Sequence, residues 1–189
     1  AFGLMGIQDK ARHLATLYLE DLGDLITGVL DPHFGFSRYA EHLGRYAYEF
    51  DEIQNELDKP LSFIDGLLNG LLEHRIKSFS PDLLAISVPF PGNLFGAFRC
   101  AQWVKEKHPS VKIAMGGGFA NTELRSLAEI RVFNYFDFVC LDDGELPLRC
   151  ILEHLEGSRN LEKLKRSFVK VDNTVHYFDG CEEKDYRQT

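Results

Sequence analysis

The sequence predicts an α/β fold with a parallel sheet, a helical N-terminal extension and a C-terminal β-hairpin. Three observations support this class. Residues 7–77 repeat apolar side chains at spacings of three and four, as helices do, and from Ser80 short apolar runs alternate with helical segments. The stretch "SFVKVDNTVHYF" then shows two short runs around Asp172 and Asn173. With 189 residues, 44% of them hydrophobic, the chain can bury a substantial core.

The N-terminal extension is predicted to contain two long helices. One face of the first helix carries Leu14, Leu17, Tyr18, Asp21, Leu22 and Leu25. The second helix follows Pro60, and its predicted buried stripe is Ile64, Leu67, Leu68, Leu71 and Leu72. The segment between them is rich in aromatic residues that we expect to form a core between the helices, namely Phe34, Phe36, Tyr39, Tyr46, Tyr48 and Phe50.

The second half reads as strands and helices in alternation. "LLAISVPF" lacks polar alternation and predicts a strand covered on both faces. Asn93 is expected to cap a helix that buries Leu94, Ala97, Phe98, Ala101 and Val104. Next we expect a strand at "VKIAM", a helix from about Thr122 and a strand at "FDFVCL". The last helix should begin near Gly144 and bury Leu148, Ile151, Leu152 and Leu155. This order is typical of a Rossmann/flavodoxin-like sheet.

These patterns divide the chain into three parts. Residues 1–78 form the helical extension, 79–160 the α/β domain, and 161–189 a hairpin and connector. The net charge of −8, without a basic stripe, argues against nucleic acid and anionic membrane surfaces as partners. No apolar run approaches the roughly 20 residues that span a bilayer. Cys100, Cys140 and Cys150 read as small buried hydrophobic residues, so we expect a reduced, cytoplasmic protein.

Three loops follow the predicted strands and should meet at one edge of the sheet. They are "SVPFPGN" (87–93), "GGGFANTE" (116–123) and "DDGELP" (142–147). The glycines suit either a tight turn or close approach of a ligand to the backbone. The carboxylates suit either the dipole of the following helix, or contact with a neutral ligand or a cation. Neither GxGxxG nor GxxxxGK[ST] occurs, which removes two familiar phosphate-binding loops.

In their order and spacing, "PDLLAISVPFPGN", "VKIAMGGGFANTELR" and "FDFVCLDDGELPL" resemble the cobalamin-binding domain of radical S-adenosylmethionine proteins. The resemblance covers about residues 80–157 and rests on the combination, since each motif alone is weak. It implies that Ser87 bonds the nucleotide tail of cobalamin, that Gly116 and Gly117 line its channel, and that Gly144 and Glu145 flank it. It further implies a cofactor site formed by Ser87, Pro89, Phe90, Asn93, Gly116, Gly117, Gly118, Asn121, Asp143, Gly144 and Glu145. Pro91 is also expected to face the corrin.

The resemblance also predicts a larger parent enzyme. "DPHFG" is one residue short of the family's cobalt-ligating D-x-H-x-x-G, so we interpret His33 as a loop residue. The family's CxxxCxxC motif does not occur, and we expect the barrel that uses S-adenosylmethionine and a 4Fe–4S cluster to lie beyond Thr189. This segment would then hold cobalamin for methyl transfer or radical chemistry in that domain and be non-catalytic alone. The alternatives are an interaction or regulatory module that has lost the cofactor, and a cation-dependent enzyme using Asp142, Asp143 and Glu145. A bulky residue at Gly117 is expected to block cofactor uptake while leaving the fold intact.

Overall fold

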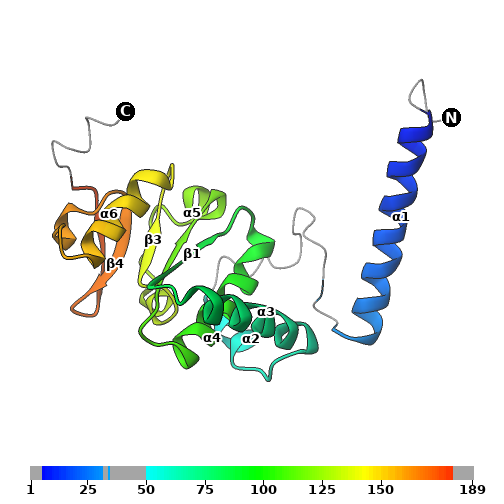
Figure 1. Cartoon of the computed structure of the whole chain (residues 1–189), viewed down its shortest axis with the longest axis horizontal. Coiled ribbons are helices and arrows are strands. Elements are labelled where there is room, and N and C mark those ends of the chain that lie inside the picture. The colour runs from blue at the N-terminus through cyan, green and yellow to red at the C-terminus, as the bar shows by residue number, and fades with distance from the viewer. Residues whose placement is uncertain (1–5, 32–33, 35–49, 181–189) are drawn as a thin grey trace.

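The computed structural model describes residues 6–31, 34 and 50–180 and shows an α/β body with a long helix standing apart from it (Figure 1). The described helices are α1 (Gly6–Val29), α2 (Phe50–Leu57), α3 (Phe63–Phe79), α4 (Leu94–Lys107), α5 (Gly118–Glu123) and α6 (Glu145–Leu155). Short 3-10 turns are η2 (Pro91–Asn93), η3 (Ile130–Asn134) and η4 (Leu161–Lys163). The strands are β1 (Leu83–Ser87), β2 (Lys112–Gly116), β3 (Phe138–Cys140), β4 (Ser167–Val171) and β5 (Thr174–Phe178).

The five strands form one mixed sheet in the order β1-β2-β3-β4-β5. The first three strands are parallel, as predicted, and β1 and β2 pair in register from Leu83 with Lys112 to Ser87 with Gly116. The C-terminal hairpin joins the same sheet, since β4 runs antiparallel to β3. The predicted turn is confirmed: Asp172 and Asn173 have φ of 46° and 63°, the left-handed conformation of a two-residue hairpin turn.

Apolar side chains cover the sheet on both faces. One core packs α4 and α5 against strand residues such as Ile113, Met115 and Val139. The other packs α6 against Ala114, Phe138 and Cys140 on the opposite face. The predicted stripe of α4 is confirmed, since its members Leu94, Ala97, Phe98, Ala101 and Val104 are all buried. The α/β class therefore rests on two apolar layers that the sequence pattern had indicated.

The edge strand β1 departs from the prediction of full coverage. Leu84 and Ile86 pack on the core beneath α4, but Ala85 and Ser87 on the other face are exposed. β1 pairs only with β2 among the described strands, so it lies at the edge of the sheet. An apolar run is therefore compatible with an edge position whose small side chains face outward.

The helices of the extension form as predicted, but their stripes behave differently. No residue of α1 is buried, so its apolar face covers nothing in the described structure. In α3, Leu67 and Leu71 are 52% and 69% exposed, whereas Asp65 and Asn69 are buried, which corrects the predicted stripe. Asp65 is buried because it forms an ion pair with the buried Arg99 of α4, with 3.2 Å between Asp65 Oδ2 and Arg99 Nε.

Arg99 also explains why α2 and α3 pack onto the α/β body. Its Nη1 donates to the carbonyl of Leu57 at 2.6 Å and its Nη2 to that of Glu56 at 2.9 Å, which satisfies the end of α2. Ile53, Leu57 and Ile76 enter the core beneath α4. Part of the N-terminal extension thus belongs to the same packed unit as the sheet.

Two further helix predictions need correction. The helix expected from Thr122 is α5, which begins at Gly118 and ends at Glu123, because Phe119 and Ala120 are the buried anchors of this segment. The last helix buries Pro147, Cys150 and Ile151, while Leu152 is 44% exposed. Of the predicted aromatic core, Phe50 packs in the main core and Phe34 is half-buried, and the other members lie outside the described residues.

Candidate functional site at the carboxyl edge of the sheet

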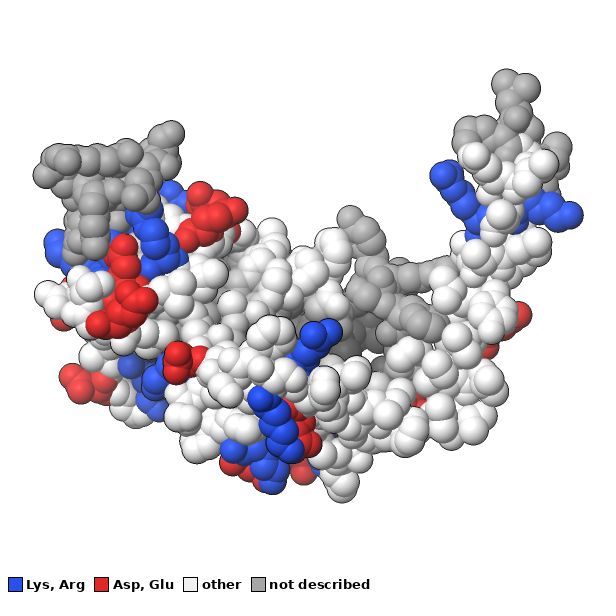
Figure 2. Space-filling view, viewed as in Figure 1, with Lys and Arg blue, Asp and Glu red and all other residues white. Residues whose placement is uncertain are grey.

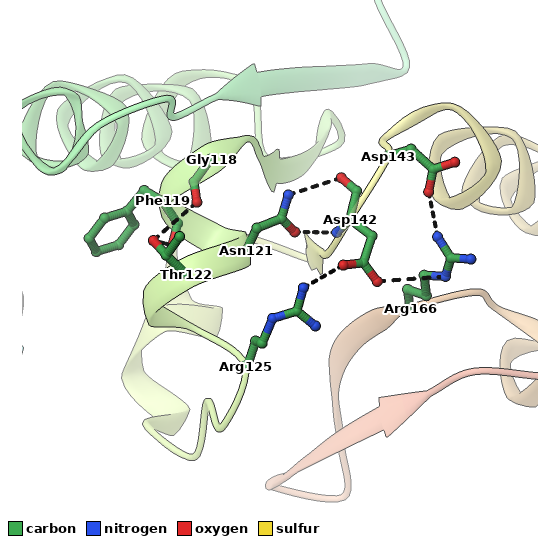
Figure 3. Close-up of polar contacts among 8 residues, drawn as sticks. All are labelled: Gly118, Phe119, Asn121, Thr122, Arg125, Asp142, Asp143 and Arg166. Carbon is green, nitrogen blue, oxygen red and sulfur yellow. Dashed lines mark hydrogen bonds and ion pairs between the residues drawn. The ribbon is translucent and has the colours of Figure 1, made fainter.

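The three motif-bearing loops meet at the carboxyl edge of the parallel strands, as the sequence predicted. Ser87 ends β1 opposite Gly116 at the end of β2. Cys140 ends β3 and is followed by the acidic loop that leads into α6. Parallel strands bring their carboxyl ends to one edge, so the residues after each strand lie close together. Figure 3 shows the polar contacts between the second and third of these loops.

Val88 joins the first two loops through its backbone. Its N–H donates to the carbonyl of Gly116 at 2.7 Å, and its own carbonyl accepts from the N–H of Phe119 at 3.0 Å. The Val88 side chain is fully buried. The loop after β1 is therefore held directly against the start of α5.

This contact gives Gly117 and Gly118 a structural reason to lack side chains. A Cβ on Gly117 would come within 2.7 Å of the Val88 carbonyl oxygen, and one on Gly118 within 2.7 Å of that of Pro89. Gly117 also has φ of +102°, which favours glycine. The expectation that a bulky residue at Gly117 would leave the fold intact is therefore wrong, because the obstacle is backbone.

Gly116 and Gly144 differ from these two glycines. A Cβ on Gly116 would lie 3.7 Å from the Cys140 carbonyl oxygen, an ordinary contact, and a Cβ on Gly144 would meet no atom within 4 Å. At neither position would neighbouring atoms clash with an added side-chain carbon. These two glycines leave backbone at the sheet edge that a ligand can approach.

Asn121 ties the second loop to the third. Its Nδ2 donates to the Asp142 carbonyl at 3.1 Å, and its Oδ1 accepts from the Asp142 N–H (Figure 3). The amide thus pairs with the Asp142 backbone as a neighbouring strand would, and it supports the φ of 61° at Asp142. Within the described structure the Asn121 side chain serves loop geometry.

Two arginines balance the acidic loop. Arg125 Nη2 lies 2.5 Å from Asp142 Oδ1, and Arg166 Nε lies 3.7 Å from Asp142 Oδ2 (Figure 3). Arg166 Nη1 also contacts Asp143. These pairs reduce the repulsion that the aspartates would exert on an anionic ligand. Sequence reasoning missed both arginines. Arg125 was visible in the motif "NTELR", but Arg166 directly precedes β4 and reaches the loop only because β4 pairs antiparallel with β3.

The other predicted residues line an exposed rim. Ser87, Pro89, Gly144 and Glu145 are exposed, and Phe90 is 43% exposed. Asn93 is half-buried, and its Oδ1 is fully buried without a hydrogen-bond partner in the described structure. It does not cap α4 through its side chain, in contrast to the prediction. Asn93 therefore carries an acceptor that the described chain leaves unsatisfied.

Neither described cavity lies at this rim. A cavity of about 430 Å³ is at the amino edge of the sheet, beside Lys112, Phe138 and Asn173. A second of about 170 Å³ lies between α4, α5 and η3, beside Phe98, Phe119 and Val132. No predicted site residue lines either cavity, so the rim is an open surface in the described structure.

The titratable groups of the described chain give no separate reactive centre. No group of three His, Cys, Asp or Glu side chains there is arranged to hold a metal ion. Burial raises the pKa of the Cys140 thiol to about 11, and burial raises that of Cys100 as well. Both thiols are thus poor nucleophiles near neutral pH. His33 lies outside the described residues.

A comparison with solved structures finds similarity to a radical enzyme. No family model and no curated protein matches the chain. A solved structure of OxsB, described as a cobalamin-dependent S-adenosylmethionine radical enzyme in its apo form, aligns with 60% of this chain at 18% identity and a TM-score of 0.47. The chain spans 16% of the length of that structure. At this identity and TM-score the similarity assigns no function. No described helix has both the length and the apolar character needed to cross a membrane.

Proposed function

We propose that this chain is a cobalamin-binding module whose cofactor site is the carboxyl edge of the sheet. The observation that carries the proposal is the meeting of the three motif-bearing loops at that edge, with Ser87 exposed opposite Gly116. The motifs on these loops are those whose combined order resembles the cobalamin-binding domain. Their juxtaposition is required for a single ligand site.

The residues at the rim fit the chemistry of the cofactor. Cobalamin has a flat corrin fringed with amide groups and a nucleotide tail that carries a phosphodiester. The unsatisfied Asn93 Oδ1 suits an amide N–H donor, and the Ser87 hydroxyl can donate to or accept from the tail. The bare backbones at Gly116 and Gly144 permit close approach. The arginine pairs beside Asp142 allow an anionic group to come near the acidic loop.

The finer role concerns a larger protein. When bound, cobalamin would supply a cobalt centre for methyl transfer or radical chemistry in a partner domain that uses S-adenosylmethionine and a 4Fe–4S cluster. In this proposal the present residues bind and orient the cofactor, with Ser87, Asn93 and Gly116 as the main contacts. Pro89, Phe90 and Glu145 lie on the same exposed rim and would contact its periphery.

Cofactor retention tests this function. The chain is mixed with hydroxocobalamin and desalted, and the visible spectrum is recorded. Retained corrin in the wild type and its loss in Ser87→Leu support the site, because Ser87 is exposed and the substitution leaves the core untouched. The matched control is Thr174→Leu, an exposed strand residue at the amino edge, which should retain corrin. Equal retention in Ser87→Leu and Thr174→Leu would contradict the assigned site.

A second candidate is an interaction module without cofactor. It is favoured by the packing of Val88 and Pro89 against Gly117 and Gly118, which accounts for two of the three glycines without a ligand. In this case the wild type would retain no corrin, and titration by calorimetry would give no heat at micromolar concentrations. The cation-dependent alternative gains no support from the carboxylates Asp142 and Asp143, since arginines already pair with them.

A further inference from the structure

An apolar stripe runs the full length of α1 and is exposed except at Leu22, which is half-buried. Its members recur at spacings of three or four residues and are Ile7, Ala11, Leu14, Tyr18, Leu22, Leu25 and Val29. Because an α-helix turns by about 100° per residue, all seven stay within about 40° of one line along the helix. Leu14 is 53% exposed, Tyr18 69% and Val29 72%. No residue of α1 is buried in the described structure.

A helix with this surface needs a partner. In proteins most of the stability of a helix comes from packing its apolar face rather than from helix propensity. In Figure 1, α1 stands apart from the α/β body, so the sheet and its helices do not cover the stripe. The stripe repeats every 11 residues, from Ile7 through Tyr18 to Val29, which suits a nearly straight or slightly right-handed helix pair.

The charges of α1 are segregated along its length. Both basic side chains, Lys10 and Arg12, lie in the first half together with one acidic side chain, Asp9, whereas the second half carries only acidic ones, namely Glu20, Asp21 and Asp24. Figure 2 shows Lys and Arg side chains toward one end of this helix and Asp and Glu side chains farther along it. On the helical wheel, Lys10, Asp21 and Asp24 lie on the same flank of the stripe. A helix with opposite charges at its two ends is complementary to an antiparallel copy of itself.

We propose that α1 is a homodimerisation helix, in which the apolar stripes of two copies pack antiparallel about a twofold axis near Tyr18. The stripe is symmetric about this residue: Ile7 faces Val29 of the second copy, Ala11 faces its Leu25, and Leu14 faces its Leu22. The same register brings Lys10 beside Asp24 of the second copy on both sides of the axis. A parallel arrangement would instead place like charges opposite each other.

An anionic membrane surface is a poorer partner for this helix. α1 has two basic side chains, Lys10 and Arg12, against four acidic ones, Asp9, Glu20, Asp21 and Asp24. Interfacial helices that bind anionic lipids are rich in Lys and Arg on their polar face. An antiparallel copy instead pairs basic side chains of one helix with acidic side chains of the other. The dimer proposal does not depend on whether the sheet edge binds cobalamin.

Sedimentation equilibrium of the full chain tests the dimer. The wild type should approach twice the 21.6 kDa mass of one chain as its concentration rises through about 1 to 100 μM. Leu14→Asp places a charge in the stripe and should weaken the dimer at least about hundredfold, without loss of the folded α/β body. Thr16→Asp adds the same charge on the opposite face of α1 and should leave the dimer unchanged. A monomeric wild type, or equal masses for both variants, would overturn the proposal.

A charge exchange tests the antiparallel direction. Lys10→Glu and Asp24→Lys should each weaken dimerisation about threefold to tenfold, and the double variant should recover the wild-type affinity. In a parallel pair, Lys10→Glu would not show this reciprocal rescue, because Lys10 and Asp24 would lie far apart. Absence of rescue therefore overturns the antiparallel register. A helix folded back on its own chain would show concentration-independent monomers, which also overturns the proposal.

Discussion

Helices α4 and α1 carry similar amphipathic patterns, but the described structure buries the apolar stripe of α4 and leaves that of α1 without a packing partner. The stripe of α4 lies against the sheet, with Phe98 and Val104 among its buried members. The stripe of α1 has no buried member, and only Leu22 in it is half-buried. The difference shows that hydrophobic periodicity identifies the apolar face of a helix but does not identify the element against which that face packs. For α4 the partner follows in sequence as β2, whereas for α1 we infer a second copy of the chain.

The largest expected difference between the two helices is in packing energy. Phe98→Ala should reduce the free energy of unfolding by about 3–5 kcal/mol, because Phe98 is 2% exposed and its ring contacts Phe50, Tyr135 and Phe136. Leu25→Ala in α1 should change the free energy of unfolding of the monomer by less than about 0.5 kcal/mol. Urea denaturation at low protein concentration measures both. A large effect of Leu25→Ala under these conditions would contradict an unpartnered α1 in the monomer.

A second difference concerns buried charge. Arg99→Met should cost about 3–4 kcal/mol, since it removes the donor to the Leu57 and Glu56 carbonyls and leaves Asp65 buried without its cation. Arg131→Ala removes solvent-exposed ion pairs with Asp51 and Glu129 and the packing on Phe50, and it should cost much less than Arg99→Met. Thermal denaturation distinguishes them. Similar melting temperatures for the two variants would show that Arg99 does not anchor α2 and α3 to α4.

The glycines at the sheet edge offer a smaller and more local test. Gly117→Ala should destabilise the chain by roughly 2–4 kcal/mol, because its Cβ meets the Val88 carbonyl and its φ is +102°. Gly144→Ala should stay within about 1 kcal/mol of wild type, as no atom lies within 4 Å of the new methyl group. Denaturant midpoints measure the contrast. Equal stability of the two variants would mean that the loops can separate without cost, and that Gly117 is free to serve a ligand.

The smallest predicted effect depends on pH. Burial raises the pKa of Cys140 from an ordinary value of 9.0 to about 11. Below pH 9.0 the thiol is protonated in both states, but between 9.0 and about 11 the unfolded chain loses the proton first, so the free energy of unfolding falls by about 2–3 kcal/mol. The Cys140→Ala variant should lose less stability than the wild type over this pH range, because it has no thiol at this position. Parallel pH profiles for Cys140→Ala and the wild type would contradict the burial of this thiol.

Much of the α/β body was predictable because its signals are local. The apolar run of β2, the stripe of α4 and the Asp172-Asn173 turn each occupy a few adjacent residues, and all three are confirmed. The meeting of the three loops followed from the parallel arrangement of the strands. The predicted stripe of α3 was right in part, since Leu72 packs against the core. It was wrong for Leu67 and Leu71, which are exposed, and Asp65 is buried through its contact with Arg99.

By itself the sequence determined which segments become strands and helices, which face of α4 is apolar, and where the candidate site lies on the sheet. Only the tertiary structure decided that the carbonyls of Val88 and Pro89 leave no room for a side chain at Gly117 and Gly118, and that Arg166, just before β4, reaches the acidic loop. It also decided that the stripe of α1 stays uncovered in the described structure. The physical reason is distance along the sequence: secondary structure follows from neighbouring residues, whereas these contacts join residues more than twenty positions apart.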